Sequence, residues 1–415
     1  MRKKTVAVIG AGNRGREVYG DLLKQEKKIK INAVAEPDEK RRNLFVEEHN
    51  IPDVHIFNSW QQLLKGKRIS DALIIATLDN MHLQPVLKAI EKGYKILLEK
   101  PIAPDLNDTL SIINKAREYD SDILIAHVLR YTNFYKKLKD IIDSNVIGQI
   151  RLVNHIENIG FYHFAHSYVR GNWRNTDTAA PIILAKSCHD MDILYWLLEK
   201  KCIKLSSHAS LKHFTESQHP AGAGDRCVNC AVEKSCPYSA VKIYINDNSG
   251  WPISVITTDL SYTGRKKALK QGSYGRCVYK CDNNVPDTQT VRMTFADNIE
   301  VNFALTAFSK DITRTTRVFG SRGEIDADFD KGIINIHSFN GDREQIKIQS
   351  EANGRHGGGD AKLIEQFSKF IFGEPLDNSL TTIEDSLESH IMAFAAEDSR
   401  KNDSVVYLDK YRVTD

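Results

Sequence analysis

The sequence predicts an α/β protein in which a doubly wound parallel sheet is followed by an α+β domain with a large, mainly antiparallel sheet. Over the first third of the chain, short β-branched apolar runs alternate with helical patterns, which is typical of strand–helix–strand units. After about residue 130, longer strand patterns follow one another through turn signals, which favours antiparallel pairing. A length of 415 residues is typical of two domains, expected here at 1–128 and 129–415.

In the first domain the apolar runs predict parallel strands that are buried on both faces, so helices should cover both sides of the sheet. The expected strands are 5–9, 31–35, 72–76, 95–98 and 122–126. The expected helices are 14–25, 38–49, 82–92 and 108–118.

The second domain is expected to combine its sheet with helices and with a cysteine-rich loop near 219–240. The expected strands are 149–157, 254–261, 288–296 and 299–306. The turn signal Ala296-Asp297-Asn298 predicts that the last two strands form an antiparallel pair. The expected helices are 188–198 and, within the C-terminal region 360–399, the helices 360–372 and 383–399.

Composition narrows the kind of partner. The 57 basic and 54 acidic side chains give a formal charge of +3, too weak by itself to indicate a nucleic-acid or membrane-surface partner. The apolar run after Met1-Arg2-Lys3-Lys4 is too short for a signal peptide and leads into a glycine turn. No apolar stretch approaches the roughly 18 residues that span a bilayer. We therefore expect a cytoplasmic protein.

A glycine-rich sequence follows the first expected strand and opens the first expected helix. Gly10-Ala11-Gly12-Asn13-Arg14-Gly15 matches the dinucleotide fingerprint in the position that the fold requires. The first glycine permits a tight turn, the second lets the backbone approach a pyrophosphate, and the third lets helix and strand pack closely. Backbone N–H groups at the helix start then bind the phosphates, so Asn13, Arg14 and the three glycines are expected to contact a dinucleotide.

An acidic residue predicts which dinucleotide is bound. Glu36 ends the second expected strand about 20 residues after the fingerprint, where a carboxylate can accept hydrogen bonds from the adenosine ribose. The same carboxylate would repel a 2′-phosphate, so NAD is expected rather than NADP. Arg41 and Arg42 leave an alternative open, because either could meet a phosphate.

The cysteines predict a metal site rather than a disulfide framework. Their number, seven, is odd, in a long chain without a secretion signal. Cys227, Cys230 and Cys236 lie within ten residues, a spacing that suits one structural, tetrahedral Zn²⁺. We choose Cys277 as the fourth ligand, with Cys281 and His219 as alternatives. Reduced thiols, a disulfide and an iron–sulfur site are the competing interpretations. No residue nearby resembles a base that would activate a thiol for catalysis.

Further motifs resemble those of the Gfo/Idh/MocA family of sugar and cyclitol oxidoreductases. The resemblance covers nearly the whole chain and includes the fingerprint, Ala76-Thr77-Leu78-Asp79-Asn80-Met81-His82, Glu99-Lys100-Pro101, His189 with Asp192, His356-Gly357-Gly358-Gly359-Asp360, and Ser386 to Arg400. It implies a two-domain enzyme whose nicotinamide lies in a cleft against an open sheet. That sheet also supports oligomerisation, so a homodimer or homotetramer is expected.

The resemblance also implies roles for single residues. Thr77, Asn80, His82, Glu99 and Lys100 would contact the cofactor. Lys100 would lie beside the nicotinamide and the substrate, with a cis bond before Pro101 fixing the turn. The alternative for Lys100 is an ordinary exposed lysine.

By the same resemblance, His189 approaches the reacting hydroxyl, where an imidazole can accept a proton. The position four residues earlier, often Asp in the family, is Ala185 here, and Lys186 adjoins it. Lys186 is therefore a candidate acid, base or anion-binding group. We expect Lys100 and His189 to come from different domains and to converge when these close. A helix cap or a buried structural histidine is the alternative for His189.

The segment 163–174 looks like a substrate loop, because it combines hydrogen-bonding groups, cations and an aromatic face. The expected substrate-binding residues are His163, His166, Arg170, Trp173 and Arg174, with Arg130 and Asp192. Arginine forks suit carboxylates, so an acidic sugar is conceivable, and simple surface arginines are the alternative.

The leading expectation is NAD-dependent oxidation of a secondary alcohol on a sugar, cyclitol or sugar derivative. Lys100 would polarise the oxygen and His189 would exchange the proton, with NAD carrying the hydride. The resemblance also allows an NAD-dependent glycosidase that acts by transient oxidation, elimination, hydration and re-reduction. A non-catalytic sensor is the third alternative, which the presence of both Lys100 and His189 disfavours.

Overall fold

The computed structural model describes residues 3–349 and 355–412, which fold as two compact units. The first unit contains Met1–Asp140, Cys188–Leu198 and Gln349–Ile391. The second unit contains Ile141–Ser187, Glu199–Ile348 and Met392–Asp415. The chain therefore crosses between the units several times, unlike a single division after residue 128.

The first unit contains a six-stranded parallel sheet with the strand order β3-β2-β1-β4-β5-β6. The strands are β1 (Lys4–Ile9), β2 (Ile29–Ala35), β3 (Ile56–Phe57), β4 (Ala72–Ile75), β5 (Lys95–Leu98) and β6 (Ile123–Ile125). The order reverses at β1, and ligands of such sheets bind beyond the carboxyl ends of the strands at that point.

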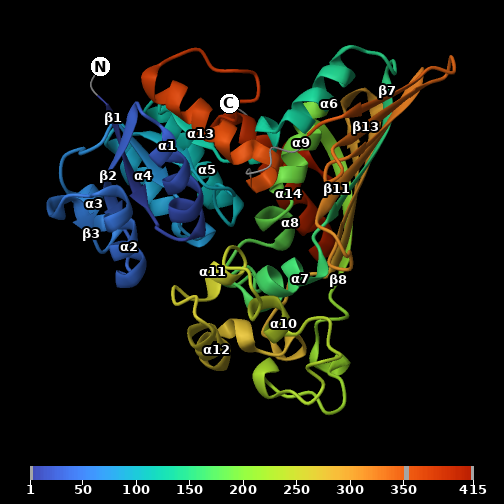
Figure 1. The fold of residues 1–415 in the computed structure, drawn as a ribbon. Coiled ribbons are helices and arrows are strands. Elements are labelled where there is room, and N and C mark those ends of the chain that lie inside the picture. The colour runs from blue at the N-terminus through green and yellow to red at the C-terminus, as the bar shows by residue number, and fades with distance from the viewer. Residues whose placement is uncertain (1–2, 350–354, 413–415) are drawn as a thin grey trace. The chain divides into compact units, whose positions relative to one another are not determined.

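Helices cover both faces of this sheet (Figure 1). One face packs against the segment η1 (Asn13–Gly20), α1 (Asp21–Gln25), α2 (Glu39–His49) and α13 (Gly359–Phe372). The other face packs against α3 (Trp60–Lys65), α4 (Leu83–Glu91) and α5 (Leu106–Glu118). The apolar face of α13 joins this core through Leu363, Phe367 and Ile371, although it lies more than 200 residues further along the chain.

Shorter helical turns and three further helices complete the first unit. The turns are η2 (Asp53–His55), η3 (Asp79–Met81), η4 (Val128–Tyr131) and η11 (Arg355–Gly358). Helix α9 (Cys188–Leu198) belongs to this unit, whereas α6 (Asn133–Asp143) and α14 (Ile383–Asn402) continue from it into the second.

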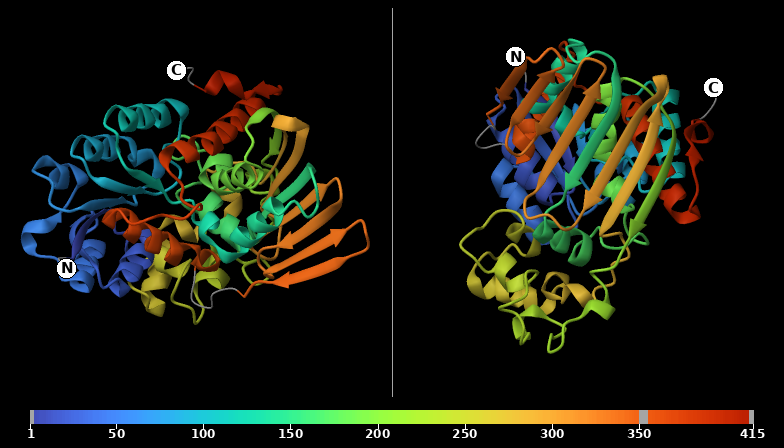
Figure 2. Two further views of the ribbon diagram at one scale, coloured as in Figure 1. Left: turned by 90° about the horizontal axis from the view of Figure 1, so that it is seen from above. Right: turned by 90° about the vertical axis from the view of Figure 1, so that its right-hand side faces the viewer.

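The second unit is built on a nine-stranded sheet with the order β14-β13-β12-β11-β7-β10-β9-β8-β15, seen face-on in the right-hand view of Figure 2. Its strands are β7 (Ile150–Asn158), β8 (Cys202–Ser210), β9 (Thr288–Phe295), β10 (Ile299–Thr306), β11 (Thr313–Gly320), β12 (Gly323–Asp328), β13 (Ile333–Ser338), β14 (Arg343–Lys347) and β15 (Val406–Tyr407). All neighbouring pairs are antiparallel except β7 and β10.

Short helices precede β8 and fill the long connection between β8 and β9. They are α7 (Phe161–Phe164), η5 (Ala165–Arg170), α8 (Ile182–Ala185), η6 (Glu216–Gln218), η7 (Cys227–Asn229), α10 (Ala240–Tyr244), α11 (Ile253–Ile256), α12 (Tyr262–Gln271), η8 (Ser273–Gly275) and η9 (Val278–Lys280). The turn η10 (Ala296–Asn298) joins β9 to β10, and η12 (Leu408–Tyr411) follows β15.

The predicted fold class is confirmed, as is the hairpin of β9 and β10 across residues 296–298. The strand predicted at 254–261 is wrong: α11 occupies its start and buries Ile253 in a small apolar core with Tyr244 and Leu269. A short apolar run between turns fits a helical turn as well as a strand, so periodicity alone misleads there.

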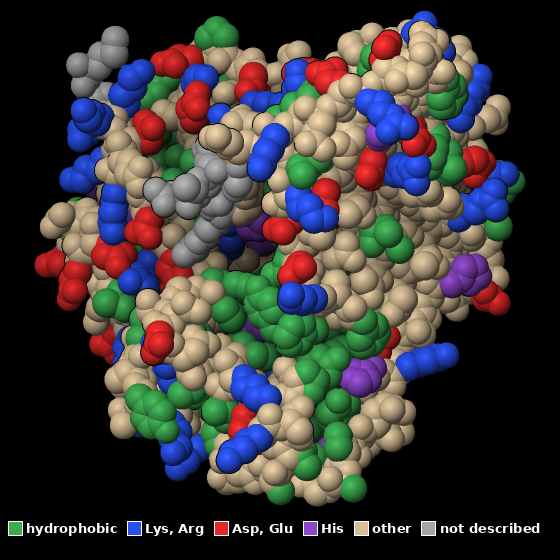
Figure 3. Space-filling model, turned by 45° about the vertical axis from the view of Figure 1, so that its right-hand side comes forward, with side chains coloured by type: hydrophobic (Ala, Val, Ile, Leu, Met, Phe, Trp, Pro, Cys, Tyr) green, Lys and Arg blue, Asp and Glu red, His purple; other side chains and the backbone are tan. Residues whose placement is uncertain are grey.

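The charged side chains of the surface agree with the weak net charge. On the face shown in Figure 3, Lys and Arg side chains lie interspersed with Asp and Glu. In the described part of the chain, no helix combines the length and apolar character needed to cross a membrane.

Candidate active site and cofactor-binding site

The predicted glycine turn follows β1 with the geometry of a phosphate-binding loop. Gly10 has a φ of +91°, and a Cβ there would lie 2.7 Å from the Ala76 carbonyl oxygen. A Cβ on Gly15 would lie 1.9 Å from the Gly10 carbonyl oxygen, so neither position accepts a side chain. A Cβ on Gly12 would meet no atom within 4 Å. That open space over exposed backbone fits a pyrophosphate.

Glu36 is held as an acceptor beside this turn. It is buried at the end of β2, where Oε2 accepts a 2.7 Å hydrogen bond from the Ala11 N–H and Oε1 a 2.9 Å bond from the Asp38 N–H. Arg42 donates to the Glu36 carbonyl oxygen at 2.7 Å, whereas Arg41 is exposed. The contact of this carboxylate with an adenosine ribose stays a prediction.

Arg14 bonds to two carboxylates. Its Nε donates to Glu99 Oε1 at 2.5 Å, and Nη2 donates to Asp360 Oδ1 and to the Tyr19 hydroxyl, each at 2.7 Å. Burial works against the charged form of Glu99, but Arg14 and Tyr19 hold the pKa of Glu99 below its usual value. Because the guanidinium is committed to these groups, the predicted contact of Arg14 with the dinucleotide stays one through its backbone N–H. Asn13 likewise donates to Glu17 Oε2, at 2.6 Å.

Asp360 extends this network to the His-Gly-Gly-Gly-Asp segment. Its Oδ2 lies 2.8 Å from His356 Nδ1, so Arg14, Glu99 and Asp360 join three motifs that the sequence presents separately. Burial opposes ionisation of Asp360, but Arg14 and then His356 keep its pKa well below the usual range.

The segment after β4 provides a group suited to a ligand. The Thr77 hydroxyl is buried and has no hydrogen-bond partner among the described residues, which fits a missing polar ligand at this site. His82 is buried, with Nδ1 2.9 Å from the Pro101 carbonyl oxygen and Nε2 3.3 Å from that of Thr77. Burial lowers the pKa of His82. Asn80 is exposed. These residues fit NAD, with His82 supporting the loop.

Lys100 follows β5 and lies among buried groups. The peptide bond before Pro101 is cis, as expected. Burial, then the charges of Arg130 and Lys100, hold the pKa of His127 well below its ordinary value. Burial raises the pKa of Cys188 to about 12, an effect that Lys100 partly opposes. Lys100 therefore lies within electrostatic reach of both His127 and Cys188.

His189 belongs to the same compact unit as Lys100, because α9 packs with the first unit although the chain on either side of it belongs to the second. Helix α9 packs with the first unit and brings the His189 ring to 5.6 Å from His127 and 6.3 Å from His356. The buried Asp192 of the same helix pairs with Arg130 through hydrogen bonds of 2.7 and 2.6 Å. Since Arg130 and Asp192 bond to each other, direct substrate contact by either is not supported.

Sequence reasoning missed a row of buried polar groups beside this site. His127 Nε2 lies 2.7 Å from the Ser386 hydroxyl, which is 3.3 Å from His390 Nδ1, and His390 Nε2 accepts from the Ile102 N–H at 2.9 Å. Like Lys100 after β5, His127 follows β6, so its place at a strand's carboxyl end was the available signal.

Lys186 lies in the second unit and pairs with a buried carboxylate. Its Nζ is 3.1 Å from Glu157 Oε1, and Arg314 Nη2 is 2.5 Å from Oε2 of the same residue. This ion pair supplies a structural role for Lys186, and its assignment as an acid, base or anion-binding group stays a prediction.

The segment 163–174 also lies in the second unit, and much of it is buried. Arg170 is fully buried and bonds to the cysteine-bearing connection, which corrects its assignment to substrate. His166 is nearly inaccessible and pairs with the Tyr244 hydroxyl at 2.8 Å. Arg174 pairs with Asp282 at 2.8 and 2.9 Å. His163 and Trp173 are half-buried and stay candidates for substrate contact.

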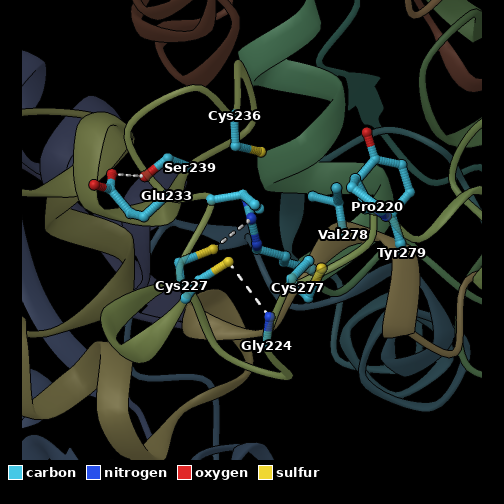
Figure 4. A pocket seen from close by; sticks show the side chains of 13 residues that line it. Pro220, Gly224, Cys227, Glu233, Cys236, Ser239, Cys277, Val278 and Tyr279 are labelled. Carbon is cyan, nitrogen blue, oxygen red and sulfur yellow. Dashed lines mark hydrogen bonds between the residues drawn. The ribbon is translucent and has the colours of Figure 1, made fainter.

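The predicted metal ligands Cys227, Cys230, Cys236 and Cys277 line one small cavity of the second unit (Figure 4). Cys281 and His219 do not line it. Across the described residues, no group of three or more His, Cys, Asp or Glu side chains is already arranged as a metal site.

Two sequence profiles match the chain. Residues 4–127 match one described as "Oxidoreductase family, NAD-binding Rossmann fold", and residues 139–406 match one described as "Oxidoreductase family, C-terminal alpha/beta domain". The chain belongs to the Gfo/Idh/MocA oxidoreductase family, whose N-terminal domain binds NAD.

Individual proteins are similar to this chain at low sequence identity. The protein YteT of Bacillus subtilis is 20% identical over 83% of each chain. Inositol 2-dehydrogenase of Corynebacterium glutamicum is 25% identical over 50% of this chain and 59% of its own length. The 2,7-anhydro-N-acetylneuraminate hydratase of Mediterraneibacter gnavus is 28% identical over 36% of this chain and 38% of its own.

A solved structure shares the fold across the full length. An oxidoreductase from Agrobacterium radiobacter, in complex with NAD⁺, L-tartaric acid and magnesium, superposes with a TM-score of 0.70. It is 16% identical and the match covers 98% of this chain and 99% of that one.

Proposed function

We propose that the protein is an NAD-dependent dehydrogenase of a secondary alcohol on a sugar, cyclitol or sugar derivative. The observation that carries the proposal is the convergence of a dinucleotide loop, Lys100 and a buried histidine cluster in one compact unit. Gly10, Glu36, Thr77, Lys100 and His127 all follow the carboxyl ends of parallel strands, where ligands of such sheets bind.

NAD supplies a nicotinamide that accepts the hydride when the alcohol becomes a carbonyl, and the hydroxyl proton must then leave. The ammonium of Lys100 orients the hydroxyl oxygen and stabilises negative charge on it. The imidazole of His189 accepts the proton. The Arg130–Asp192 pair positions α9, and therefore His189, beside His127.

Glu36 supports NAD over NADP, because its carboxylate already accepts two backbone hydrogen bonds and would repel a 2′-phosphate. Calorimetric titration with both cofactors tests this. Tighter binding of NADP would contradict the assignment.

A second candidate is a redox-neutral reaction that uses the same oxidation transiently, as in NAD-dependent glycoside cleavage. The 2,7-anhydro-N-acetylneuraminate hydratase among the relatives supports this candidate. Oxidation of a ring hydroxyl acidifies the neighbouring C–H, which allows elimination, addition of water and return of the hydride.

The deciding experiment compares NADH production with glycoside cleavage over neutral and acidic sugars, cyclitols and their glycosides. Net NADH formation with alcohols supports the dehydrogenase. Cleavage that requires NAD without net NADH supports the second candidate. If the protein binds NAD but shows neither activity, both candidate functions are contradicted, and a non-catalytic sensor is the alternative that is left.

We also propose a cytoplasmic homodimer or homotetramer assembled through the nine-stranded sheet, which is open because β14 and β15 form its two edges. Light scattering coupled to size-exclusion chromatography tests the assembly, and a monomer would contradict it.

A further inference from the structure

The four cysteines that line the small cavity come from separate stretches that the backbone holds together. Cys227 and Cys230 belong to η7 and its end, Cys236 precedes α10, and Cys277 precedes η9. Arg226 and Arg276 form an antiparallel bridge, and the Cys277 N–H donates to the Asp225 carbonyl oxygen at 2.8 Å. The bridge sets Cys277 opposite Asp225, two residues before Cys227, so main-chain bonds hold the sequence-distant fourth thiol close to the other three.

One of the sulfurs already accepts a backbone hydrogen bond. The Gly224 N–H donates to Cys230 Sγ, with 3.4 Å between nitrogen and sulfur. Figure 4 draws this bond as a dashed line from Gly224. A hydrogen bond to sulfur favours the thiolate over the thiol, and bonds of this kind orient metal ligands.

Arg170 points to an anion in this cavity. The Arg170 side chain lines the cavity and is fully buried. Its Nη2 lies 3.5 Å from Cys227 Sγ and 2.7 Å from the Tyr238 carbonyl oxygen. Nη1 has no hydrogen-bond partner, and no carboxylate of the described residues lies within ion-pair distance of Arg170. A buried charge without a counter-ion is strongly destabilising. Glu233 also lines the cavity, but its carboxylate accepts a hydrogen bond from Ser239, so neutral thiols or a disulfide would leave the guanidinium without an ion-pair partner.

We propose that Cys227, Cys230, Cys236 and Cys277 bind one Zn²⁺ and that Arg170 is the counter-cation of this site. Four thiols lose four protons to solvent when the ion binds, and four thiolates around a divalent ion leave a net charge of −2. The buried guanidinium offsets half of that charge. The thiols are not prearranged as a finished tetrahedron, so rotation of cysteine side chains into the cavity accompanies binding.

The cavity is small, with a volume of about 20 Å³, which suits a single bound ion. Zn²⁺ prefers tetrahedral sulfur ligands at about 2.3 Å, which suits four cysteines around a small space.

The site gives this connection a stabilising element that its own core lacks. Between β8 and β9 the chain runs from residue 211 to 287, and the core cluster there contains five buried residues, Cys227, Ala240, Tyr244, Ile253 and Leu269. A metal ion that joins residues 227–236 to residue 277 closes most of this connection. Its role is structural, and it lies outside the proposed chemistry of Lys100 and His189.

The test measures zinc by elemental analysis in full-length protein purified without chelator. We expect about one zinc per chain in the native protein and in Cys281→Ser, a matched control whose thiol lies four residues from Cys277 but outside the cavity. Cys277→Ser should lose most of the metal. Arg170→Met should keep every ligand but lower zinc affinity by about 10–100-fold, measured against a chromophoric chelator.

Native protein that lacks zinc and binds none when reduced and titrated with zinc sulfate would overturn the proposal. So would an equal zinc content in Cys277→Ser and native protein, bound iron with sulfide, or a disulfide among these cysteines. If Cys277→Ser does not fold, titration of native protein with a mercurial reagent replaces it: loss of one zinc as four thiols react supports the site, and four thiols that react without zinc release exclude it.

Discussion

Arg14 and Arg170 are both largely buried arginines, but the two units neutralise them differently. Arg14 in the first unit bonds to the carboxylates of Glu99 and Asp360. Arg170 in the second unit is more deeply buried, yet it contacts a thiol and backbone carbonyls and has no carboxylate partner among the described residues.

The difference shows that a chain can supply a counter-charge permanently or conditionally. Carboxylates are ionised at neutral pH, so the Arg14 network is complete without a ligand. Thiols become anions mainly when a cation replaces their protons, so the surroundings of Arg170 become balanced only when a metal binds. We therefore expect substitutions in the first unit to change chemistry and intrinsic stability, and those near Arg170 to act through metal retention.

The largest expected effect is on turnover. Lys100→Ala and His189→Ala should each lower kcat about 100-fold to 10,000-fold, because a positioned acid or base contributes that much. NAD affinity should fall modestly at most for Lys100→Ala and change little for His189→Ala. Steady-state kinetics on a substrate found by the sugar panel measures the first quantity and calorimetry the second. Lys88→Ala, on the exposed side of α4, is the control. Near-native turnover in both variants would show that the active site lies elsewhere.

The next effect concerns the Arg14 network. Arg14→Met should lower the free energy of unfolding by about 3–5 kcal/mol, because Glu99 and Asp360 are left as buried carboxylates without their cation. Urea denaturation measures this. Adding Glu99→Gln and Asp360→Asn should recover part of the loss. In metal-free protein, Arg170→Met should cost less, because removal of a buried charge without a counter-ion offsets the loss of its hydrogen bonds. Equal losses for the two arginine variants would remove the contrast between the units.

Buried histidines predict a pH dependence in the first unit. Burial lowers the pKa of His390 to about 3 from an ordinary 6.5. Between these values the unfolded chain carries the proton and the folded chain does not, so stability falls as pH falls, by about 1.4 kcal/mol per pH unit for this group. His390→Gln should reduce the slope of unfolding free energy between pH 6.5 and 5 by that amount. An unchanged slope would mean that His390 titrates normally in the fold.

The smallest effect is on cofactor choice. Glu36→Gln keeps an acceptor for the Ala11 N–H but removes the negative charge, so NAD affinity should fall roughly tenfold and the preference over NADP should narrow. Calorimetry with both cofactors measures the ratio. If the ratio of NAD to NADP affinity does not change, another residue sets the selectivity. Arg42→Ala is the variant for comparison.

The elements that have a clear local pattern of apolar residues could be predicted. Alternating runs placed the strands of both sheets that were expected, except at 254–261, and β10 was predicted with its observed ends. Strands β11 to β13 were not predicted, although buried positions alternate with more exposed ones along each of them, as they do along β9. Strand β14 has no such alternation and was not predicted either. The cysteine-bearing connection follows no periodicity because its short helices are held by turns and a small core.

The candidate site could be predicted residue by residue but not as an arrangement. Glycine spacing predicted Gly10 and Gly15, a strand end predicted Glu36, and the resemblance of the Glu-Lys-Pro motif predicted Lys100. No local signal could show that Arg14 meets Asp360 at a separation of 346 residues, or that Arg170 faces cysteines rather than a substrate. Such contacts depend on which elements pack together, and that information is spread over the whole chain.

The way α13 completes the first unit has a consequence during synthesis on the ribosome. The strands of the first sheet are all synthesised once residue 125 is added, but α13, which completes the core on one face of the sheet, forms only after residues 359–372 emerge. At typical elongation rates of about 5–20 residues per second, that delay is roughly 10–50 seconds. A nascent chain with this topology lacks the α13 part of this apolar core for that time, which makes it a natural client for ribosome-associated chaperones.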